Sequence, residues 1–266
     1  MAGIDLYELA SFLAANGPHR VLPASRRLRV IFNRVVIVDT TSAVFVWEHD
    51  RYPQYYVPAT ALVGCVVREK RSLEDGKAAV VELSVGSAGG GDKVTTDRVL
   101  RFADDPGLGP LANLARLEFG AMDQWLEEDV PIYVHPKDPY KRIDVLPSSR
   151  TIEVKIGNET VAKASSSVHL LETGLPARYY ISPGAVDPAL LRKSSLTTKC
   201  PYKGEAEYWH VVLAGGKEEV VENVVWQYRI PTHESSGIAG LLCFYNERVD
   251  VFLDGVLQER PKTHFA

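Results

Sequence analysis

The sequence feature with the most chemical potential is the segment CPYKG, in which the thiol of Cys200 lies three residues before Lys203. Cysteine reacts as a thiolate, and a neighbouring ammonium group such as Lys203 or Lys199 lowers the pKa of a thiol. In this interpretation Cys200 is a nucleophile or redox thiol, and Lys203 assists it. In the alternative, Cys200 is a half-buried cysteine at the end of a strand, where Pro201 and Gly204 shape a turn.

A catalytic cysteine also needs a base, and no histidine or acid near Cys200 in the sequence supplies one. His169 and His210 are the candidates that folding would have to bring close. The sequence contains neither GxSxG nor HExxH, so it lacks the usual signals of serine hydrolases and zinc peptidases.

Aromatic and cationic residues gather in the second half of the chain and form the candidate ligand-binding set. They are Arg178, Tyr180, Tyr202, Trp209, Trp226 and Tyr228, beside Tyr179. Aromatic walls around one or two polar anchors are typical of small-molecule sites. Strand aromatics equally form the core of a domain. Two cations, Arg178 and Lys203, favour a pocket because a core rarely contains charged groups.

Metal binding is not indicated, and we expect no cofactor. The three cysteines, Cys65, Cys200 and Cys243, form no CxxC pair, so the usual spacing of zinc ligands is absent. The segment HPKDPYKRID is either a connecting loop or a second polar site anchored by His135, Asp138, Tyr140 and Arg142.

Composition describes an ordinary globular chain of 266 residues, with 45% hydrophobic and 24% charged residues. A formal charge of −4 argues against electrostatic binding of nucleic acid or of an anionic membrane. The first residues carry Asp5 and Glu8 and have no basic region, which is a poor match to a signal peptide. We therefore predict a soluble, cytoplasmic protein whose partner is an unidentified small molecule; the sequence leaves its oligomeric state open.

An internal repeat organises the elements that must position these residues. The segment Val21–Arg26 (VLPASR) returns 124 residues later (145 − 21) as Val145–Arg150 (VLPSSR). The same offset pairs Glu48 with Glu172 and Tyr55-Tyr56 with Tyr179-Tyr180. Collinear identities at one offset indicate a duplication. We expect a lead-in over residues 1–20, a divergent repeat over 21–144, a second repeat over 145–260 and a tail over 261–266.

Most segments of both repeats have strand character, because β-branched residues and period-two alternation predominate. Predicted strand regions are 28–38, 44–47, 80–85, 152–161, 208–213, 220–228 and 249–253. A helix is predicted in the N-terminal stretch, with Asp5 as its cap, Ile4 and Leu9 as a hydrophobic staple, and an end at Gly17. A second helix is predicted over 111–119, and the stretch 87–92 (SAGGGD) is predicted to be a hairpin loop.

Several segments of the second repeat occur in a specific order: ETGLPARYY, TTKCPYKGEAEYW, VVWQY and IAGLLCFYNERVDVFLDG. The first repeat contributes RYPQYY, WLEED and VHPKDPYKRIDVLPSSR. Over residues 20–260 this set resembles the family catalogued as domain of unknown function 427, sometimes labelled a nucleotidyltransferase. The resemblance implies a mainly β, β-tent-like fold of two small antiparallel sheets per repeat, meeting at an angle. It implies no agreed activity. The carboxylates and phosphate grip that nucleotidyl transfer requires have no matching constellation here.

The two repeats differ where ligand chemistry is predicted. By alignment, Cys200–Lys203 correspond to Ser72–Asp75, Trp209 to Val81 and Trp226 to Leu100. We therefore predict a small-molecule-binding module with its site in the second repeat. A cysteine-dependent enzyme acting through Cys200 is one alternative, and a non-catalytic interaction scaffold is the other.

Overall fold

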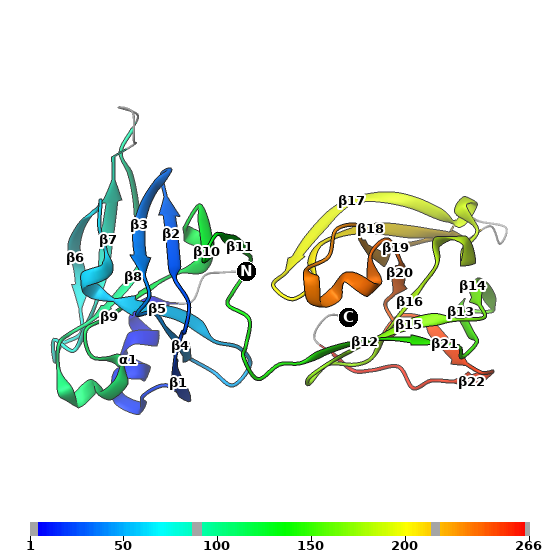
Figure 1. The fold of residues 1–266 in the computed structure, drawn as a ribbon, viewed down its shortest axis with the longest axis horizontal. Coiled ribbons are helices and arrows are strands. Elements are labelled where there is room, and N and C mark those ends of the chain that lie inside the picture. The colour runs from blue at the N-terminus through cyan, green and yellow to red at the C-terminus, as the bar shows by residue number, and fades with distance from the viewer. Residues whose placement is uncertain (1–4, 87–91, 214–218, 264–266) are drawn as a thin grey trace. The chain divides into compact units, whose positions relative to one another are not determined.

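The duplicated sequence folds into two β units with the same succession of strands. The computed structural model describes residues 5–86, 92–213 and 219–263. It divides the chain into an N-terminal unit, Met1–Asp138, and a C-terminal unit, Pro139–Ala266. Each unit contains a large seven-stranded and a small four-stranded antiparallel sheet (Figure 1).

In the N-terminal unit, β1 and β4 to β9 form the large sheet, and β2, β3, β10 and β11 form the small sheet. The large sheet has the order β1 (Arg20–Pro23), β4 (Val44–Trp47), β5 (Gln54–Pro58), β9 (Leu114–Leu117), β8 (Val94–Phe102), β7 (Ala78–Val85) and β6 (Val66–Ser72). The small sheet has the order β11 (Val130–Ile132), β10 (Gln124–Glu127), β2 (Leu28–Phe32) and β3 (Val35–Thr40).

The C-terminal unit repeats this topology strand for strand. Its large sheet has the order β12 (Ile143–Ser148), β15 (Ser167–Glu172), β16 (Arg178–Ile181), β20 (Leu242–Phe244), β19 (Glu219–Tyr228), β18 (Gly204–Leu213) and β17 (Leu191–Cys200). Its small sheet has the order β14 (Glu159–Ala164), β13 (Ile152–Ile156), β21 (Asp250–Leu253) and β22 (Val256–Leu257). The mainly β fold in two similar halves, predicted from the repeat, is therefore confirmed.

Helical segments are few and short. The α-helix α1 covers Leu6–Asn16, and the 3₁₀ turns within the described residues are η1 (Ala59–Ala61), η2 (Pro106–Leu111), η3 (Phe119–Ala121), η4 (Pro183–Ala185), η5 (Pro188–Leu190) and η6 (His233–Ile238). None of the helices in the described part of the chain is long and apolar enough to cross a membrane.

Helix α1 begins and ends where the sequence predicts. The carboxylate of Asp5 accepts hydrogen bonds from the backbone N–H groups of Tyr7 and Glu8, which satisfies two donors that the helix leaves unpaired. Gly17 ends the helix with a positive φ of 71°, a conformation that glycine adopts without strain. The predicted staple residue Ile4 lies outside the described residues, as does 87–91 of the predicted hairpin loop.

The predicted helix over 111–119 is wrong. Residues Leu114–Leu117 form β9, which pairs with β5 and β8 in the middle of the large sheet. Pro110 and Asn113, which has a φ of 56°, interrupt any helix before it starts. All four residues of β9 are buried, so their apolar pattern reflects a central strand rather than a helix face.

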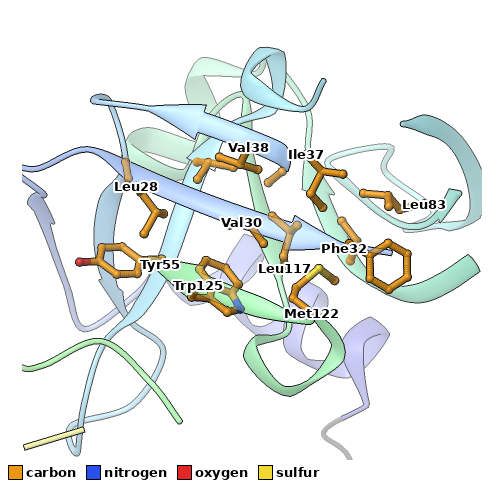
Figure 2. Packing of buried hydrophobic residues seen from close by; sticks show 14 of the residues in the cluster. Leu28, Val30, Phe32, Ile37, Val38, Tyr55, Leu83, Leu117, Met122 and Trp125 are labelled. Carbon is orange, nitrogen blue, oxygen red and sulfur yellow. The ribbon is translucent and has the colours of Figure 1, made fainter. Parts of the chain in front are cut away.

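In each unit one core lies between the two sheets. In the N-terminal unit it combines small-sheet residues such as Leu28, Val30 and Trp125 with Tyr55 and Leu117 of the large sheet (Figure 2). The corresponding C-terminal core combines Ile152 and Val154 with Val211, Val225 and Leu242 among others.

A second cluster covers the other side of each large sheet, which we call the outer face. Because side chains alternate along a strand, every second residue points to it. In the N-terminal unit the outer face carries Val46, Tyr56, Leu100 and Phe102, with α1 packed on top through Leu6, Ala10 and Leu13. In the C-terminal unit it carries Leu170, Tyr180, Ala206, Tyr208, Trp226 and Tyr228. The described part of that unit contains no α-helix.

Candidate functional site

Strand register shows how the two outer faces correspond. Trp226 pairs with Tyr208 on one side and Cys243 on the other, whereas Leu100 pairs with Val80 and Arg116. Tyr228 and Phe102 are likewise equivalent, since they pair with Ala206 and Ala78. The C-terminal unit therefore has larger, polar-edged rings at three positions where the N-terminal unit has Val80, Leu100 and Phe102.

The rings of the C-terminal outer face are joined by hydrogen bonds and edge contacts. The indole N–H of Trp226 donates to the hydroxyl of Tyr180 at 3.0 Å, and the two rings meet edge to face. Tyr245 packs against the other side of Trp226, with ring centres 4.5 Å apart. The hydroxyls of Tyr208 and Thr198 are 2.9 Å apart. Such pairing fixes the orientation of each ring.

Arg178, at the start of β16, is buried beside these rings and fully paired. Its Nη1 and Nη2 donate to the two carboxylate oxygens of Glu247 at 2.5 and 2.6 Å, and Nη1 also contacts Asn246. Its guanidinium carbon lies 5.5 Å from the centre of the Trp226 ring. Burial opposes ionisation of Glu247, but hydrogen bonds from Arg178 and Thr263 outweigh it and lower the pKa of that carboxyl.

Lys203 is also paired. It lies in the turn between β17 and β18, and its ammonium group contacts the carboxylate of Glu172, with both side chains largely buried. The N-terminal unit has the equivalent carboxylate, Glu48, but binds it with Arg116 from β9 and with the hydroxyl of Tyr56. The duplication thus conserves a buried glutamate and changes the residue that neutralises it. The two cations predicted as anchors, Arg178 and Lys203, both carry a carboxylate partner.

The hydroxyl of Tyr228 differs from its neighbours because no residue in the described ranges hydrogen-bonds to it. The residue is only 5% exposed. Burial, followed by the nearby thiol of Cys200, raises the pKa of Tyr228 well above its usual value, so the hydroxyl stays protonated. The hydroxyl itself is not sealed from solvent, so it is a position where a ligand atom or a water molecule can form a hydrogen bond.

Cys200 is the last residue of β17, pairs with Gly204 and is partly exposed. Both lysines predicted to activate its thiol lie beside a carboxylate. Lys203 contacts Glu172, and Lys199 lies 3.6 Å from Glu205. The two candidate histidines lie elsewhere. His169 packs edge-on against Tyr179, away from the outer face. His210 is six residues along β18 from Gly204, roughly 20 Å away.

The remaining predicted residues, Trp209 and Tyr202, lie in different parts of the C-terminal unit. Trp209 points to the opposite side of the sheet from Tyr208, packs on the core between the sheets and has the ammonium of Lys193 3.9 Å from its ring centre. Tyr202 lies in the turn between β17 and β18, where its carbonyl accepts hydrogen bonds from Thr232 and from Ser235 at 3.2 Å. The structure therefore brings Tyr180, Trp226 and Tyr228 together and places Trp209 apart from them.

Four residues of this cluster did not emerge from the sequence: Tyr208, Cys243, Tyr245 and Glu247. Tyr208 could have been found from alternation, because it lies two residues after the small Ala206 and two before His210 on β18. Cys243 is completely buried next to Tyr180, and burial raises the pKa of its thiol to about 12. Glu247 lies 69 residues from Arg178, and no local pattern links them.

The junction segment contributes side chains to both units. In the N-terminal unit, Asp138 accepts a hydrogen bond from the indole N–H of Trp47 at 3.2 Å, and His135 stacks on Tyr52 at 4.1 Å. In the C-terminal unit, Arg142 pairs with Asp144 at 2.8 Å, and Tyr140 is exposed. The four residues predicted as one set of anchors thus belong to two different units.

Among the residues that the structure describes, no three His, Cys, Asp or Glu side chains lie close enough to hold a metal ion. A search of curated proteins finds no match to this chain. The family model described as a domain of unknown function, DUF427, matches residues 20–128 and again 144–255. These two segments are most of the chain and contain nearly all of the strands of the two units. The protein therefore belongs to the DUF427 family and carries two copies of its domain.

Proposed function

We propose that the C-terminal unit binds a small, planar, uncharged molecule at the outer face of its large sheet. The observation that carries this proposal is the hydroxyl of Tyr228, which reaches the surface from a residue packed among aromatic rings and has no hydrogen-bond partner in the described residues. A ligand that stacks on a ring and accepts this hydrogen bond would satisfy it.

The charges of the site argue for a neutral ligand. Each buried cation faces a carboxylate, Arg178 with Glu247 and Lys203 with Glu172, so the site has no net charge to offer an ion. Tyr208, Trp226 and Tyr228 are 5–6% exposed, so only a small part of each residue reaches the surface. Flat molecules with hydrogen-bonding edges, such as nucleobases and nicotinamide, fit these conditions.

The N-terminal unit shows that the fold does not require the aromatic residues Tyr208, Trp226 and Tyr228. The same strands pack with Val80, Leu100 and Phe102 at the equivalent positions, and α1 covers the face. Fold stability alone therefore does not explain a hydroxyl at position 228, since a phenyl ring satisfies the same place. Polar groups that the packing does not require are typical of binding sites.

The test uses a panel of neutral planar heterocycles, namely the nucleobases, nicotinamide and indole, with the full chain. A compound that binds the native state raises the melting temperature and changes the fluorescence of Trp226. We expect Tyr228→Phe to unfold at the same temperature as wild type without ligand and to bind roughly fivefold more weakly, the effect of one hydrogen bond. Tyr52→Phe, which removes a tyrosine hydroxyl in the N-terminal unit, is the matched control.

Two outcomes oppose the proposal. If no member of the panel binds, or if Tyr228→Phe binds as tightly as wild type, the outer face is a core and the interaction-scaffold alternative gains support. Cys200→Ser distinguishes the cysteine-enzyme alternative, because a binding module keeps its affinity when the thiol becomes a hydroxyl.

A further inference from the structure

A separate hollow of about 350 Å³ lies in the N-terminal unit, where the start of α1 meets the edge of the large sheet. Its lining residues are Asp5, Leu6 and Tyr7 from the helix, Lys70 and Arg71 from β6, Val80 from β7, and Asp97 and Arg98 from β8. The volume is at the lower end of the range for small-molecule sites. None of these residues belongs to the site proposed for the C-terminal unit.

Irregular strand pairing builds this hollow. In a regular strand, consecutive side chains point to opposite faces. Here both Lys70 and Arg71 line the hollow, and so do Asp97 and Arg98. This is possible because β6 bulges at Lys70, and β8 carries one extra residue opposite Glu82. Bulges re-aim side chains and are frequent beside functional sites.

The charges within the hollow are only partly balanced. Lys70 donates to Asp97 at 2.6 Å, and Arg98 donates to Glu118 at 2.8 Å. Asp5 is engaged by the helix N–H groups that it caps. Arg71 has no carboxylate partner within the described residues; its guanidinium carbon lies over the Tyr7 ring, 3.6 Å from the ring centre. An arginine stacked in this way keeps its N–H edge available for a carboxylate or phosphate.

We infer that this hollow binds a small molecule with a single oxyanion head group, carboxylate or phosphate, and an apolar body. The head group pairs with Arg71, which lies over the ring of Tyr7, and the body packs on Leu6 and Val80, the aliphatic residues of the lining. The stacked arginine contributes both charge and direction, because its two parallel N–H donors match the geometry of an oxyanion.

The C-terminal unit shows the same kind of irregular strand pairing, but the residues at its irregular positions differ from those that line the hollow. Its strands β17, β18 and β19 lose register at the corresponding level, around Ser194, His210 and Asn223. There Ser194 donates to the side chain of Asn223 at 2.6 Å, and the backbone N–H of Asn223 donates to His210 at 3.1 Å. These polar groups hydrogen-bond to one another. The anion site is therefore a property of the N-terminal unit, where α1 is present.

The test titrates the full chain with benzoate, phenyl phosphate, acetate and inorganic phosphate at constant ionic strength, followed by NMR and calorimetry. We expect saturable binding of benzoate or phenyl phosphate at one site, weaker binding of the two anions without an apolar body, and shifts of the amide signals of residues 70, 71 and 97. Arg71→Gln should weaken binding about tenfold, as expected for a charge-assisted hydrogen bond.

Arg68→Gln is the matched control, because Arg68 is an exposed arginine on the same strand outside the hollow. Equal losses in Arg71→Gln and Arg68→Gln would mean attraction to surface charge only and would overturn the inference. So would the absence of saturable binding by all four anions. Tyr7→Leu tests the role of the ring: with the melting temperature preserved, it should weaken binding by several fold, and unchanged binding would contradict the proposed geometry.

Discussion

At the scale of single residues, the two units differ in the cation that pairs with an equivalent buried glutamate. The glutamate duplicated at positions 48 and 172 has kept its place in both units, although its cation is Arg116 in one and Lys203 in the other. A buried carboxylate without a cation is strongly unfavourable, so one partner cannot be lost before another is gained. The unit that uses Lys203 leaves the Arg116 position to the thiol of Cys243.

The pairing of Arg178 with Glu247 predicts how stability depends on pH. The folded-state pKa of Glu247 lies below its ordinary value of 4.5, so its contribution to stability is present above that pH and is lost as pH falls through the folded pKa. Glu247→Gln should be less stable than wild type at neutral pH, and the difference should shrink as the solution is acidified below pH 4.5. Urea unfolding at a series of pH values measures it. A constant difference would contradict the assignment.

At the scale of elements, α1 decides what the N-terminal outer face can be. The helix seals that face with Leu13, which is 1% exposed, while Phe12 on the same helix is half exposed. Leu13→Ala should destabilise the N-terminal unit by about 2–5 kcal/mol, since it opens a cavity against the sheet. Phe12→Ala should change little. Each unit contains two of the four tryptophans. In a variant that keeps only the two tryptophans of one unit, tryptophan fluorescence reports the unfolding of that unit.

Should Leu13→Ala instead lower the unfolding midpoint of the C-terminal unit as well, the two units would be energetically coupled. Unchanged stability would mean that α1 is not needed to cover the outer face. Far-ultraviolet circular dichroism on the same samples shows whether the helix itself is lost.

The sequence predicts this helix and interior strands such as β2, β7, β13, β18 and β19, because their apolar residues are periodic. The interior strands β5, β8, β16 and β20 were not predicted. Strands β6 and β17 were not predicted, since both lie at sheet edges and their residues are mostly exposed and polar, as in LRKSSLTTKC. The helix expected over 111–119 failed for the opposite reason: β9 is buried on both faces and shows no alternation. Because side chains alternate along β18, Trp209 and Tyr208 are expected on opposite faces of the sheet. The irregular pairing of β18 with β19 that follows Trp209 is visible only in three dimensions.

At the scale of the whole molecule, duplication has produced one topology with two different outer faces. The repeat was evident from collinear identities, and it predicts which positions are equivalent. It does not predict that Arg178 meets Glu247 or that Lys203 replaces Arg116, because those contacts join strands that are distant in sequence. Comparing the two units is therefore more informative about the site than either unit alone.

The division into units makes a final prediction. Each unit has its own core between two sheets and its own outer-face cluster, and neither core borrows residues from the other unit. Fragments 1–138 and 139–266 should therefore each fold and unfold cooperatively on heating. Near-ultraviolet circular dichroism and amide dispersion in NMR measure this. A C-terminal fragment that stays unfolded, while the intact chain folds, would contradict this prediction.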